Sequence, residues 1–435
     1  MKYQAYPEYK DSGVEWLGEV PAYWRFARFK FFANVQKGKL PKKIVADEDG
    51  KFPPYLTMDY LRTGYPENFV DDKSLVPIND GEVLLLWDGA NAGEFIKSRY
   101  GVISSTVAHI KFISQFNHRF CWYLVKSLEI ELRTSTIGMG IPHVSGEKLN
   151  NLIFYEPLFL EQQQIANFLD HETAKIDTLI EKQQQLIKLL KEKRQAVISH
   201  AVTKGLNPNA PMRDSGVEWL GEVPEHWIVA QLKFNTVEMQ TGPFGSQLHA
   251  EDYIDDGIPL VNPAHMTDGK IVPDLKVSVD EETWHRLKRH QLFEGDLILA
   301  RRGELGRCAI VTKKQEGWIC GTGSLKAKLN NRLIPEYSYL LITSDGVVSE
   351  LSLESKGSTM DNLNTEALGR VRLPVPPVDE QRKILDYVND VSGKFRNLID
   401  KASSAIALIQ ERRSALISAA VTGKIDVRHW NGVSA

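Results

Sequence analysis

The sequence predicts a mixed α/β protein in which two globular domains are separated by two long antiparallel coiled-coil helices, related by an internal pseudo-two-fold repeat. The segment 11–24 returns as 214–227, with twelve of fourteen residues identical at an offset of 203. A second pair of segments, 161–203 and 380–422, matches at an offset of 219. This period is too long for a solenoid, so we interpret the chain as two copies of one body.

Two long helices are predicted after Pro157 and after Pro376-Pro377. Acidic residues follow these prolines, where a helix N-terminus favours negative charge. Gly205 and Gly423 stand where left-handed caps end helices. The 43 residues from Glu161 to Thr203 would form a helix about 65 Å long, at ~1.5 Å per residue.

Apolar residues recur along both predicted helices at alternating steps of four and three, which indicates a heptad seam. The expected seam positions are Ile176, Ile180, Gln183, Ile187, Leu190, Arg194, Val197 and Ala201 in the first helix, and Phe395, Ile399, Ala402, Ile406, Ile409, Arg413, Leu416 and Ala420 in the second. Further apolar positions are expected to widen each stripe beyond a two-helix seam: Leu179, Leu186, Ile198, Leu398, Ala405 and Ile417. The twin helix is the expected partner of each stripe.

The stretches 25–137 and 228–356 share little residue identity, and each is predicted to be a compact α/β domain. The apolar runs Val83 to Trp87 and Leu297 to Ala300 are candidate buried strands. A helix is expected from Phe116 to Arg133. The predicted division is 1–157 for the first globular domain, 158–206 for the central helix, 207–377 for the second globular domain, and 378–435 for the last helix and tail.

Composition limits the class of protein. A chain of 435 residues with 42% hydrophobic and 25% charged residues is typical of a globular protein of two or three domains. We expect no membrane span and no signal peptide, because no run approaches ~20 apolar residues and the N-terminus has no apolar core. Three cysteines without a CxxC pair indicate neither a disulfide framework nor a zinc site. We therefore expect a cytoplasmic protein.

Charge is uneven along the chain although the net charge is only −3. Residues 285–332 hold eleven Lys and Arg against four acids, and residues 25–51 hold eight against three. Solvated surface charge would explain either run alone. Basic stretches in both halves of a duplicated chain favour nucleic-acid binding.

Motifs for catalysis are missing. The string nearest to an adenine methyltransferase loop is Phe52-Pro53-Pro54-Tyr55, whose phenylalanine cannot accept a hydrogen bond from an adenine amine. The chain has no GxxxxGK[ST] loop, and the pair His285 and His290 lacks the spacing of a helical metal site. We therefore expect no catalysis and no metal site in this chain alone.

Three motifs resemble the specificity (S) subunit of type I restriction–modification enzymes. They are the block Asp-Ser-Gly-Val-Glu-Trp-Leu-Gly-Glu-Val-Pro-x-x-Trp, the run Pro376 to Gln381 that opens a long helix, and the run Ala420 to Val427. The resemblance covers nearly the whole chain. One departure is Tyr155 to Gln162, which has one proline fewer than its counterpart in the second half.

The resemblance implies a non-catalytic subunit that reads a bipartite, asymmetric site in double-stranded DNA, one half-site for each target-recognition domain. It also implies that the helices set the gap between half-sites and dock two methyltransferase subunits, and that motor–nuclease subunits join the complex. No cofactor is expected in this chain, since S-adenosylmethionine, ATP and Mg would lie on those partners.

Candidate DNA contacts are polar residues on loops that follow predicted strands. Arg301 or Arg302 would pair with O6 and N7 of a guanine; alternatively, the two would be surface arginines that contact phosphate or nothing. At the matched positions of the first half, Asp88 would accept from cytosine N4, whereas Trp87 fits a core role equally well. The other candidates are Lys37, Lys39, Lys42, Lys43, Asn91, Thr106, His143, Phe244, Ser246, Gln247, Glu304, Arg307, Ser324, Lys326, Thr359 and Asn362.

Two other functions remain open on the residues alone. The first is a non-catalytic coiled-coil adaptor that joins two protein partners, which would lack the steep salt dependence of DNA binding. The second is an intact methyltransferase or nuclease, against which the missing motifs weigh.

Overall fold

The computed structural model describes residues 3–47, 50–134, 142–355 and 363–432. It contains two compact units, and the two long helices α4 (Phe159–Lys204) and α9 (Val378–Val421) contribute to both. Unit 1 comprises Met1–Gln185 and Ser403–Ala435, and unit 2 comprises Leu186–Ala402. The predicted boundaries of the globular domains therefore stay a prediction, because this division falls within the long helices.

Unit 1 is built around an antiparallel four-stranded sheet in the order β4-β11-β8-β9, namely Ala33–Lys37, Val107–Phe112, Val83–Leu86 and Phe95–Lys97. All four residues of β8 are buried, which confirms the strand predicted there, with Trp87 just beyond its end. Smaller strand pairs surround the sheet: β1 (Tyr9–Asp11) with β2 (Glu19–Pro21), β3 (Arg25–Arg28) with β12 (Ile153–Glu156), β5 (Ile44–Val45) with β7 (Phe69–Val70), and β6 (Tyr55–Leu56) with β10 (Val102–Ile103).

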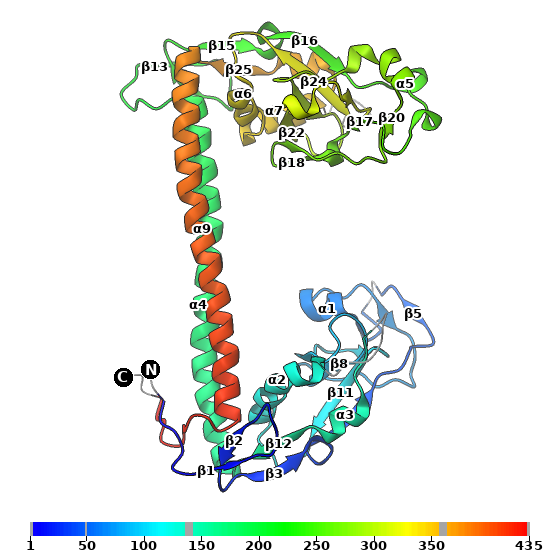
Figure 1. The fold of residues 1–435 in the computed structure, drawn as a ribbon, viewed down its shortest axis with the longest axis vertical. Helices are drawn as coiled ribbons and strands as arrows, with labels where there is room; N and C mark the ends of the chain where they lie inside the picture. The colour runs from blue at the N-terminus through cyan, green and yellow to red at the C-terminus, as the bar shows by residue number, and fades with distance from the viewer. Residues whose placement is uncertain (1–2, 48–49, 135–141, 356–362, 433–435) are drawn as a thin grey trace. The chain divides into compact units, whose positions relative to one another are not determined.

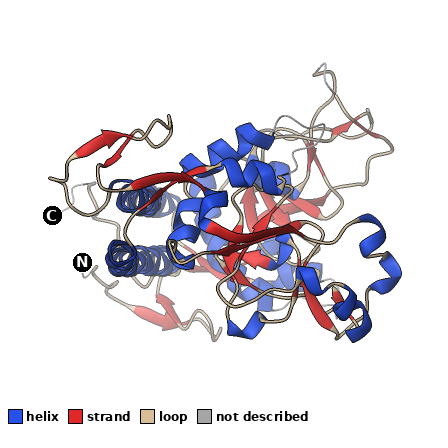
Figure 2. Ribbon diagram, turned by 90° about the horizontal axis from the view of Figure 1, so that it is seen from above, coloured by secondary structure: helices blue, strands red, loops and turns tan. Residues whose placement is uncertain are grey.

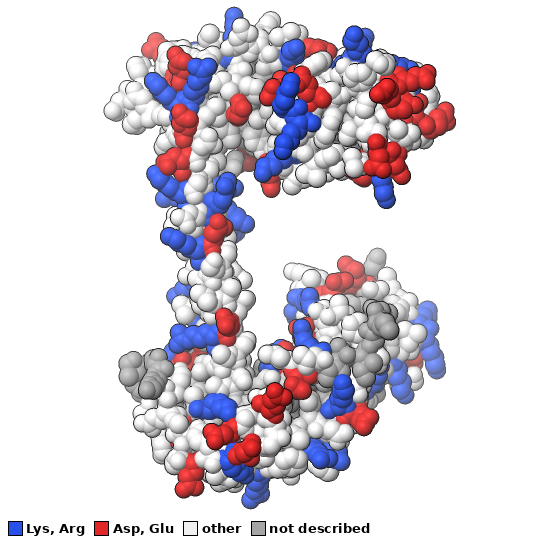
Figure 3. All heavy atoms as spheres, in the orientation of Figure 1, with Lys and Arg blue, Asp and Glu red and all other residues white. Residues whose placement is uncertain are grey.

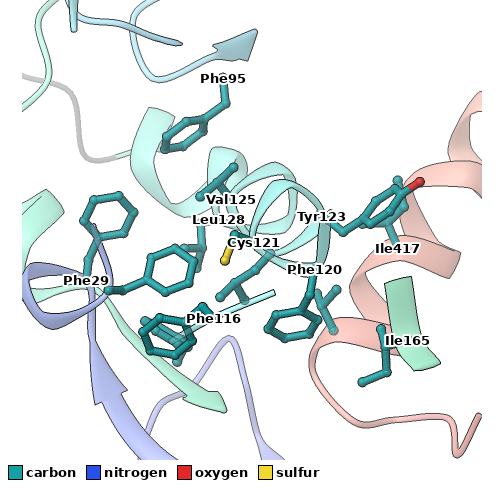
Figure 4. Close-up of a cluster of buried hydrophobic side chains, with 14 of the residues drawn as sticks. Phe29, Phe95, Phe116, Phe120, Cys121, Tyr123, Val125, Leu128, Ile165 and Ile417 are labelled. Atoms are coloured by element: carbon teal, nitrogen blue, oxygen red, sulfur yellow. The ribbon is translucent and has the colours of Figure 1, made fainter. Parts of the chain in front are cut away.

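The main core of unit 1 lies between this sheet and helix α2 (His118–Thr134), which occupies the predicted helical stretch. Phe120, Leu124 and Leu128 of α2 are buried against Phe29 and Phe116, as Figure 4 shows in part. Two shorter helices complete the unit, α1 (Met58–Thr63) and α3 (Gly146–Asn151). The core continues into the long helices, so the sheet and the helix pair form one packed body.

Unit 2 repeats this topology. Its four-stranded sheet has the order β16-β24-β21-β22, namely Thr236–Thr241, Ser324–Leu329, Leu297–Ala300 and Cys308–Ile310. The parallel pair β17 (Ile258–Val261) and β23 (Ile319–Cys320) corresponds to β6 and β10 of unit 1. The duplication therefore extends through the stretches whose sequences have diverged.

Unit 2 has a longer stretch between its matched segments than unit 1, since the offset rises from 203 to 219, and additional short elements lie there. The remaining strands are β13 (Met212–Asp214), β14 (Glu222–Pro224), β15 (Ile228–Gln231), β18 (Met266–Thr267), β19 (Lys270–Ile271), β20 (Ser278–Val279) and β25 (Arg372–Val375). Its short helices are α5 (Glu281–Arg286), α6 (Pro335–Ile342), α7 (Asp345–Ser355) and α8 (Thr365–Arg370). Strand β20 pairs with β17 and widens the second sheet of this unit to three strands.

The long helices pack side by side and run antiparallel, as predicted (Figures 1 and 2). In unit 1, Ile165 near the start of α4 shares a core with Ile417 near the end of α9. In unit 2, Val202 at the end of α4 shares a core with Ile384 at the start of α9. Both helices end at glycines with positive φ, Gly205 at 78° and Gly423 at 75°, which confirms the predicted caps.

The predicted seam positions are buried or half-buried along both helices. The positions predicted to widen the stripe beyond the seam differ in exposure: Leu179, Leu186 and Leu398 are 49%, 43% and 49% exposed, whereas Ile198 and Ala405 are half-buried and Ile417 is buried. A single partner helix covers only a narrow seam, and these leucines flank it. The two helices therefore leave apolar side chains uncovered.

The arginine that interrupts each seam has a different environment in the two units. Arg413 donates to both carboxylate oxygens of Asp177, with Nε–Oδ1 at 2.9 Å and Nη2–Oδ2 at 3.3 Å. Its counterpart Arg194 has a buried Nε that finds no hydrogen-bond partner in the part of the chain that is described. At the offset of 219, the position that matches Asp177 is occupied by Arg396. Of the two ion pairs that the repeat could form, the one between Arg413 and Asp177 is present, whereas Arg194 has Arg396 at the corresponding position.

Candidate nucleic-acid interface

The repeated block forms a two-stranded hairpin with the same internal bonds in both units. The amide of Gly13 donates to Asp11 Oδ1 at 2.9 Å, and Gly216 donates to Asp214 Oδ1 at the same distance. The registers of β1 with β2 and of β13 with β14 also match. These bonds explain why the block keeps its short polar residues and glycines.

Each block, which we call a clasp (11–24 or 214–227), contacts the start of one long helix and the end of the other. Trp24 Nε1 donates to Glu161 Oε1 of α4 at 3.2 Å. Trp227 Nε1 donates to Glu380 Oε2 of α9 at 3.1 Å. The clasps are therefore parts of the helix framework. This role was missed from the sequence, although tryptophan and glutamate recur together at both places.

Two lysines complete the clasps from the ends of the opposite helices. Lys424, beyond the end of α9, donates to the carbonyl of Glu19 in unit 1. Lys204, at the end of α4, donates to the carbonyls of Leu220 and Glu222 in unit 2. Residues near the two chain ends also bond to each other in unit 1, where the amide of Asp426 donates to the carbonyl of Gln4 at 2.8 Å.

In unit 2, candidate reading residues gather at the end of β21. The Arg301 amide donates to Gly323 O at 2.9 Å, and its carbonyl accepts from Leu363 N at 2.8 Å. The Arg301 Nε donates to Leu363 O at 3.0 Å. Burial lowers the pKa of Arg301, and the neighbouring charge of Arg302 lowers it further. Arg302 itself is exposed and lines an open hollow with Phe244.

In unit 1, the matched backbone bonds hold different side chains at the end of β8. The Trp87 amide donates to Thr106 O at 2.8 Å, and the Trp87 carbonyl accepts from Val144 N at 2.9 Å. Lys37 Nζ lies 3.2 Å from Asp88 Oδ2 and 5.3 Å from the centre of the Trp87 ring. Asp88 also forms a backbone bridge with His143. The structure therefore brings together five candidates predicted from sequence.

We refer to these two clusters as the strand-end sites. The unit 1 strand-end site consists of Lys37, Trp87, Asp88, Thr106 and His143, and the unit 2 strand-end site consists of Phe244, Arg301, Arg302, Thr322 and Gly323. The matching backbone bonds make Trp87 of unit 1 the equivalent of Arg301 of unit 2, and Asp88 the equivalent of Arg302. This agrees with the sequence offset of 214.

A glycine beside each strand-end site allows two backbone segments to cross closely. A Cβ atom on Gly38 would lie 2.2 Å from Ser104 O, and one on Gly242 would lie 1.8 Å from Gly321 O. The amides of these glycines bond to matched carbonyls, Val107 O and Ser324 O, both at 2.9 Å. Only glycine fits such a crossing. The shared pattern Gln-x-Gly at 36–38 and 240–242 was the signal for it in the sequence.

Some candidates do not belong to an accessible site. Ser324 is buried and its hydroxyl donates to Val261 O at 2.8 Å, and the buried Lys326 ammonium donates to Gln291 O at 3.0 Å. The expectation that these two line a DNA groove is therefore corrected, because neither side chain reaches the surface. Thr359 and Asn362 lie outside the described residues.

Other candidates lie near the strand-end sites or pair with protein groups. Lys39 and Lys42 are exposed after β4, and Asn91 is half-buried in the loop after β8. Ser246 and Gln247 are exposed in the turn beyond Phe244. Pairs within the protein engage the others: Lys43 with Asp71 at 3.1 Å, and Arg307 with Glu304 at 3.0 Å.

Basic and acidic side chains are interspersed over each unit on the face shown in Figure 3. Within the described ranges, no group of three or more His, Cys, Asp or Glu residues could hold a metal ion. In the same part of the chain, no helix is long and apolar enough to cross a membrane.

Comparisons with known proteins agree with this architecture. The family model described as the type I restriction modification DNA specificity domain matches residues 21–189 and 244–403. The type I restriction enzyme MjaVIII specificity subunit of Methanocaldococcus jannaschii is 27% identical over 421 residues, which cover 95% of each chain. The EcoBI specificity subunit of Escherichia coli is 22% identical over 315 residues, or 72% of this chain and 66% of that protein.

One solved structure, from a study of complex assembly and conformational transition in the type I R-M system, contains a chain with a similar fold. The TM-score is 0.57 at 16% identity, and the match covers 92% of this chain and 98% of that chain. Two family matches, one in each half, and a relative aligned over nearly the whole length agree with the duplicated fold. The chain belongs to the specificity subunits of type I restriction–modification systems, the non-catalytic components that bind DNA for the complex.

Proposed function

We propose that each unit reads one half of a bipartite site in double-stranded DNA through its strand-end site. The observation that supports this proposal is the difference in side chains on a matched backbone frame. The same pair of bonds presents Trp87-Asp88 in unit 1 and Arg301-Arg302 in unit 2. Direct base reading depends on the donor and acceptor pattern of such side chains. Two different patterns suit two different half-sites, so the target would be asymmetric.

The helices α4 and α9 would dock two methyltransferase subunits. Large apolar side chains on these helices remain exposed beside the seam: Leu179, Leu186 and Leu189 on α4, and Leu398 and Leu408 on α9. Apolar side chains that recur along a helix surface favour a protein partner. S-adenosylmethionine, ATP and Mg would be bound by the methyltransferase and motor–nuclease subunits.

Base reading is tested with the double variant Arg301→Ala/Arg302→Ala in complex with a methyltransferase partner. Methylated positions are mapped by sequencing the DNA of cells that carry the complex. The variant is expected to lose selectivity in one half-site while the other half-site and the gap stay unchanged. Equal loss in both half-sites would contradict the assignment of one half-site to each unit.

The adaptor alternative is separated from DNA reading by the salt dependence of binding to duplex DNA. Each phosphate neutralised by Lys or Arg contributes about 0.9 to the negative slope of log K against log[salt]. The complex is expected to show a steep slope, and Lys39→Ala/Lys42→Ala is expected to reduce it. A complex that assembles but binds duplex DNA without a negative slope would support the adaptor instead.

The docking surface is tested by replacing exposed leucines with aspartate. Leu189→Asp and Leu408→Asp should weaken co-purification with the methyltransferase without lowering the melting temperature of this chain. The exposed Lys191→Asp serves as a control for the change in charge on α4. Unchanged co-purification by both leucine variants would exclude this surface.

A further inference from the structure

The unit 2 strand-end site combines two adjacent arginines whose environments differ sharply. Arg301 is held at both backbone atoms and at its side chain, by Gly323 and by Leu363. Its Nε points to a protein carbonyl 3.0 Å away, and the side chain is partly buried. A guanidinium held in this way ties the end of β21 to Leu363. Arg301 therefore has the contacts of a positioning residue.

Arg302 has the opposite properties. It is exposed, and among the described residues nothing forms a hydrogen bond or an ion pair with its guanidinium. It lines an open hollow together with Phe244, Gly245, Thr322, Gly323 and the neighbouring Arg301. Two of these residues are glycines, so backbone and solvent rather than bulky side chains surround the arginine there. As far as the described residues go, the planar donor fork of Arg302 is thus available to a ligand in the hollow.

Phe244 stands in the same hollow as a fixed apolar wall. Its side chain is 62% exposed. The turn that carries it is nevertheless held, because Phe244 N donates to Gln247 Oε1 at 3.3 Å and Arg286 Nη1 donates to Gln247 O at 2.7 Å. Arg286 is in turn paired with Asp252 at 2.7 Å. The guanidinium of Arg302 could donate to the edge of a base, and the exposed ring of Phe244, on a turn held by hydrogen bonds, could contact an apolar part of a base.

We infer that Arg302 reads one guanine of the unit 2 half-site, that Phe244 makes an apolar contact with the neighbouring base, and that Arg301 only positions the backbone that carries Arg302. This inference rests on the proposed function and specifies it, since it assigns one base and one residue. Arginine can donate two parallel hydrogen bonds to guanine O6 and N7, a pattern that no other base presents in the major groove. A lysine ammonium can also reach O6 and N7, but it is a flexible point charge without the planar fork, so it discriminates guanine less strictly.

The two arginines therefore differ in their tolerance of lysine. At position 301 a single hydrogen bond to the Leu363 carbonyl is required, and a lysine ammonium can supply one. At position 302 two parallel donors are required. Arg301→Lys should keep the recognised sequence, whereas Arg302→Lys should relax it at one guanine. This crossed pattern would not arise if both arginines only contacted phosphates, because lysine serves that purpose as well.

The experiment selects bound sequences from randomised duplex DNA with the purified complex of this chain and its methyltransferase. Arg302→Ala and Arg302→Lys should each reduce discrimination at a single guanine roughly 10-fold or more, with the other positions unchanged. Arg301→Ala should weaken binding to all sequences alike and lower the melting temperature, and Arg301→Lys should restore both. Phe244→Ala should reduce selectivity at the base beside that guanine. Lys314→Ala, an exposed cation outside the hollow, is the matched control.

Two kinds of failure are distinguishable. If the wild-type complex selects no split sequence, the proposed function itself is wrong. If the wild type selects one but Arg302→Lys keeps every position strict, or Arg301→Lys relaxes a base, only the division of roles between the two arginines is overturned.

Discussion

Glycines that have no room for a side chain are the residues beside the strand-end sites that tolerate substitution least. Gly242 crosses so close to Gly321 that an added Cβ would lie 1.8 Å from its carbonyl oxygen. Gly242→Ala is therefore expected to destabilise the protein by about 1–3 kcal/mol through overpacking. Urea unfolding followed by circular dichroism measures the loss.

A matched glycine on the same chain provides the control. Gly393 lies exposed in the interior of α9, and an added Cβ would meet nothing within 4 Å. Gly393→Ala should stabilise the helix by up to about 1 kcal/mol. If both alanine variants changed stability in the same direction, the close crossing would not be the cause.

A buried histidine makes the stability of unit 2 depend on pH. Burial lowers the pKa of His290 from its ordinary value of 6.5, against the opposing effect of the hydrogen bond to Thr241 O at 2.9 Å. The nearby charges of Lys326 and Arg289 lower it further. The unfolded chain therefore binds a proton more readily near pH 6.5 than the folded chain does.

The resulting prediction concerns the acid side of neutrality. This contribution to stability is present above about pH 6.5 and is lost as the pH falls below it, because protonation then favours the unfolded state. His290→Gln should flatten this part of the curve when the free energy of unfolding is measured from pH 7 to pH 5. The exposed His285→Gln should leave the curve as it is in the wild type.

At the scale of elements, the helix pair carries an ion pair at one of two equivalent places. Arg396→Asp would give Arg194 the partner that Asp177 gives Arg413. A gain of up to about 1 kcal/mol is expected for such a partly exposed pair. The gain should vanish when Arg194→Ala is added, which a double-mutant cycle measures. A gain that persists without Arg194 would show that removal of the Arg396 charge alone is responsible.

The elements also show how far the sequence could be interpreted. The seam, the caps at Gly205 and Gly423 and the strands β8 and β21 follow from periodicity and turn residues, and the structure confirms them. The exposure of Leu179 and Leu398 could not be predicted in this way. Periodicity indicates which residues are apolar, but it does not reveal how many helices share the seam.

The candidate site was predictable only in part, for a similar reason. The offset of 214 in the sequence aligns Trp87 with Arg301, because a strand keeps its length when its loops diverge. Burial of Ser324 and Lys326 depends on strands and loops distant in sequence, which supply the carbonyls that they bond. The division between Arg301 and Arg302 likewise depends on Leu363, 62 residues further along the chain.

At the scale of the whole molecule, the first half contains what is needed to pair with a copy of itself. A chain of residues 1–206 carries one clasp, one long helix, and both Asp177 and Arg194. We expect it to form a dimer in which each Arg194 pairs with Asp177 of the other copy. Analytical ultracentrifugation measures the association, and Asp177→Arg, which would place like charges together, should weaken it. A half-chain that stays monomeric at high concentration would contradict this view of the helix pair.

The covalent link between the two halves has a further consequence for the DNA targets that such a protein can have. Two identical half-chains would carry identical readers, so their target would be an inverted repeat. Linking the halves through Gly205 into one polypeptide fixes the stoichiometry at one reader of each kind. Under the proposed function, a covalent link would therefore remove the requirement for a palindromic target, and each reader could change its preferred base without altering the other.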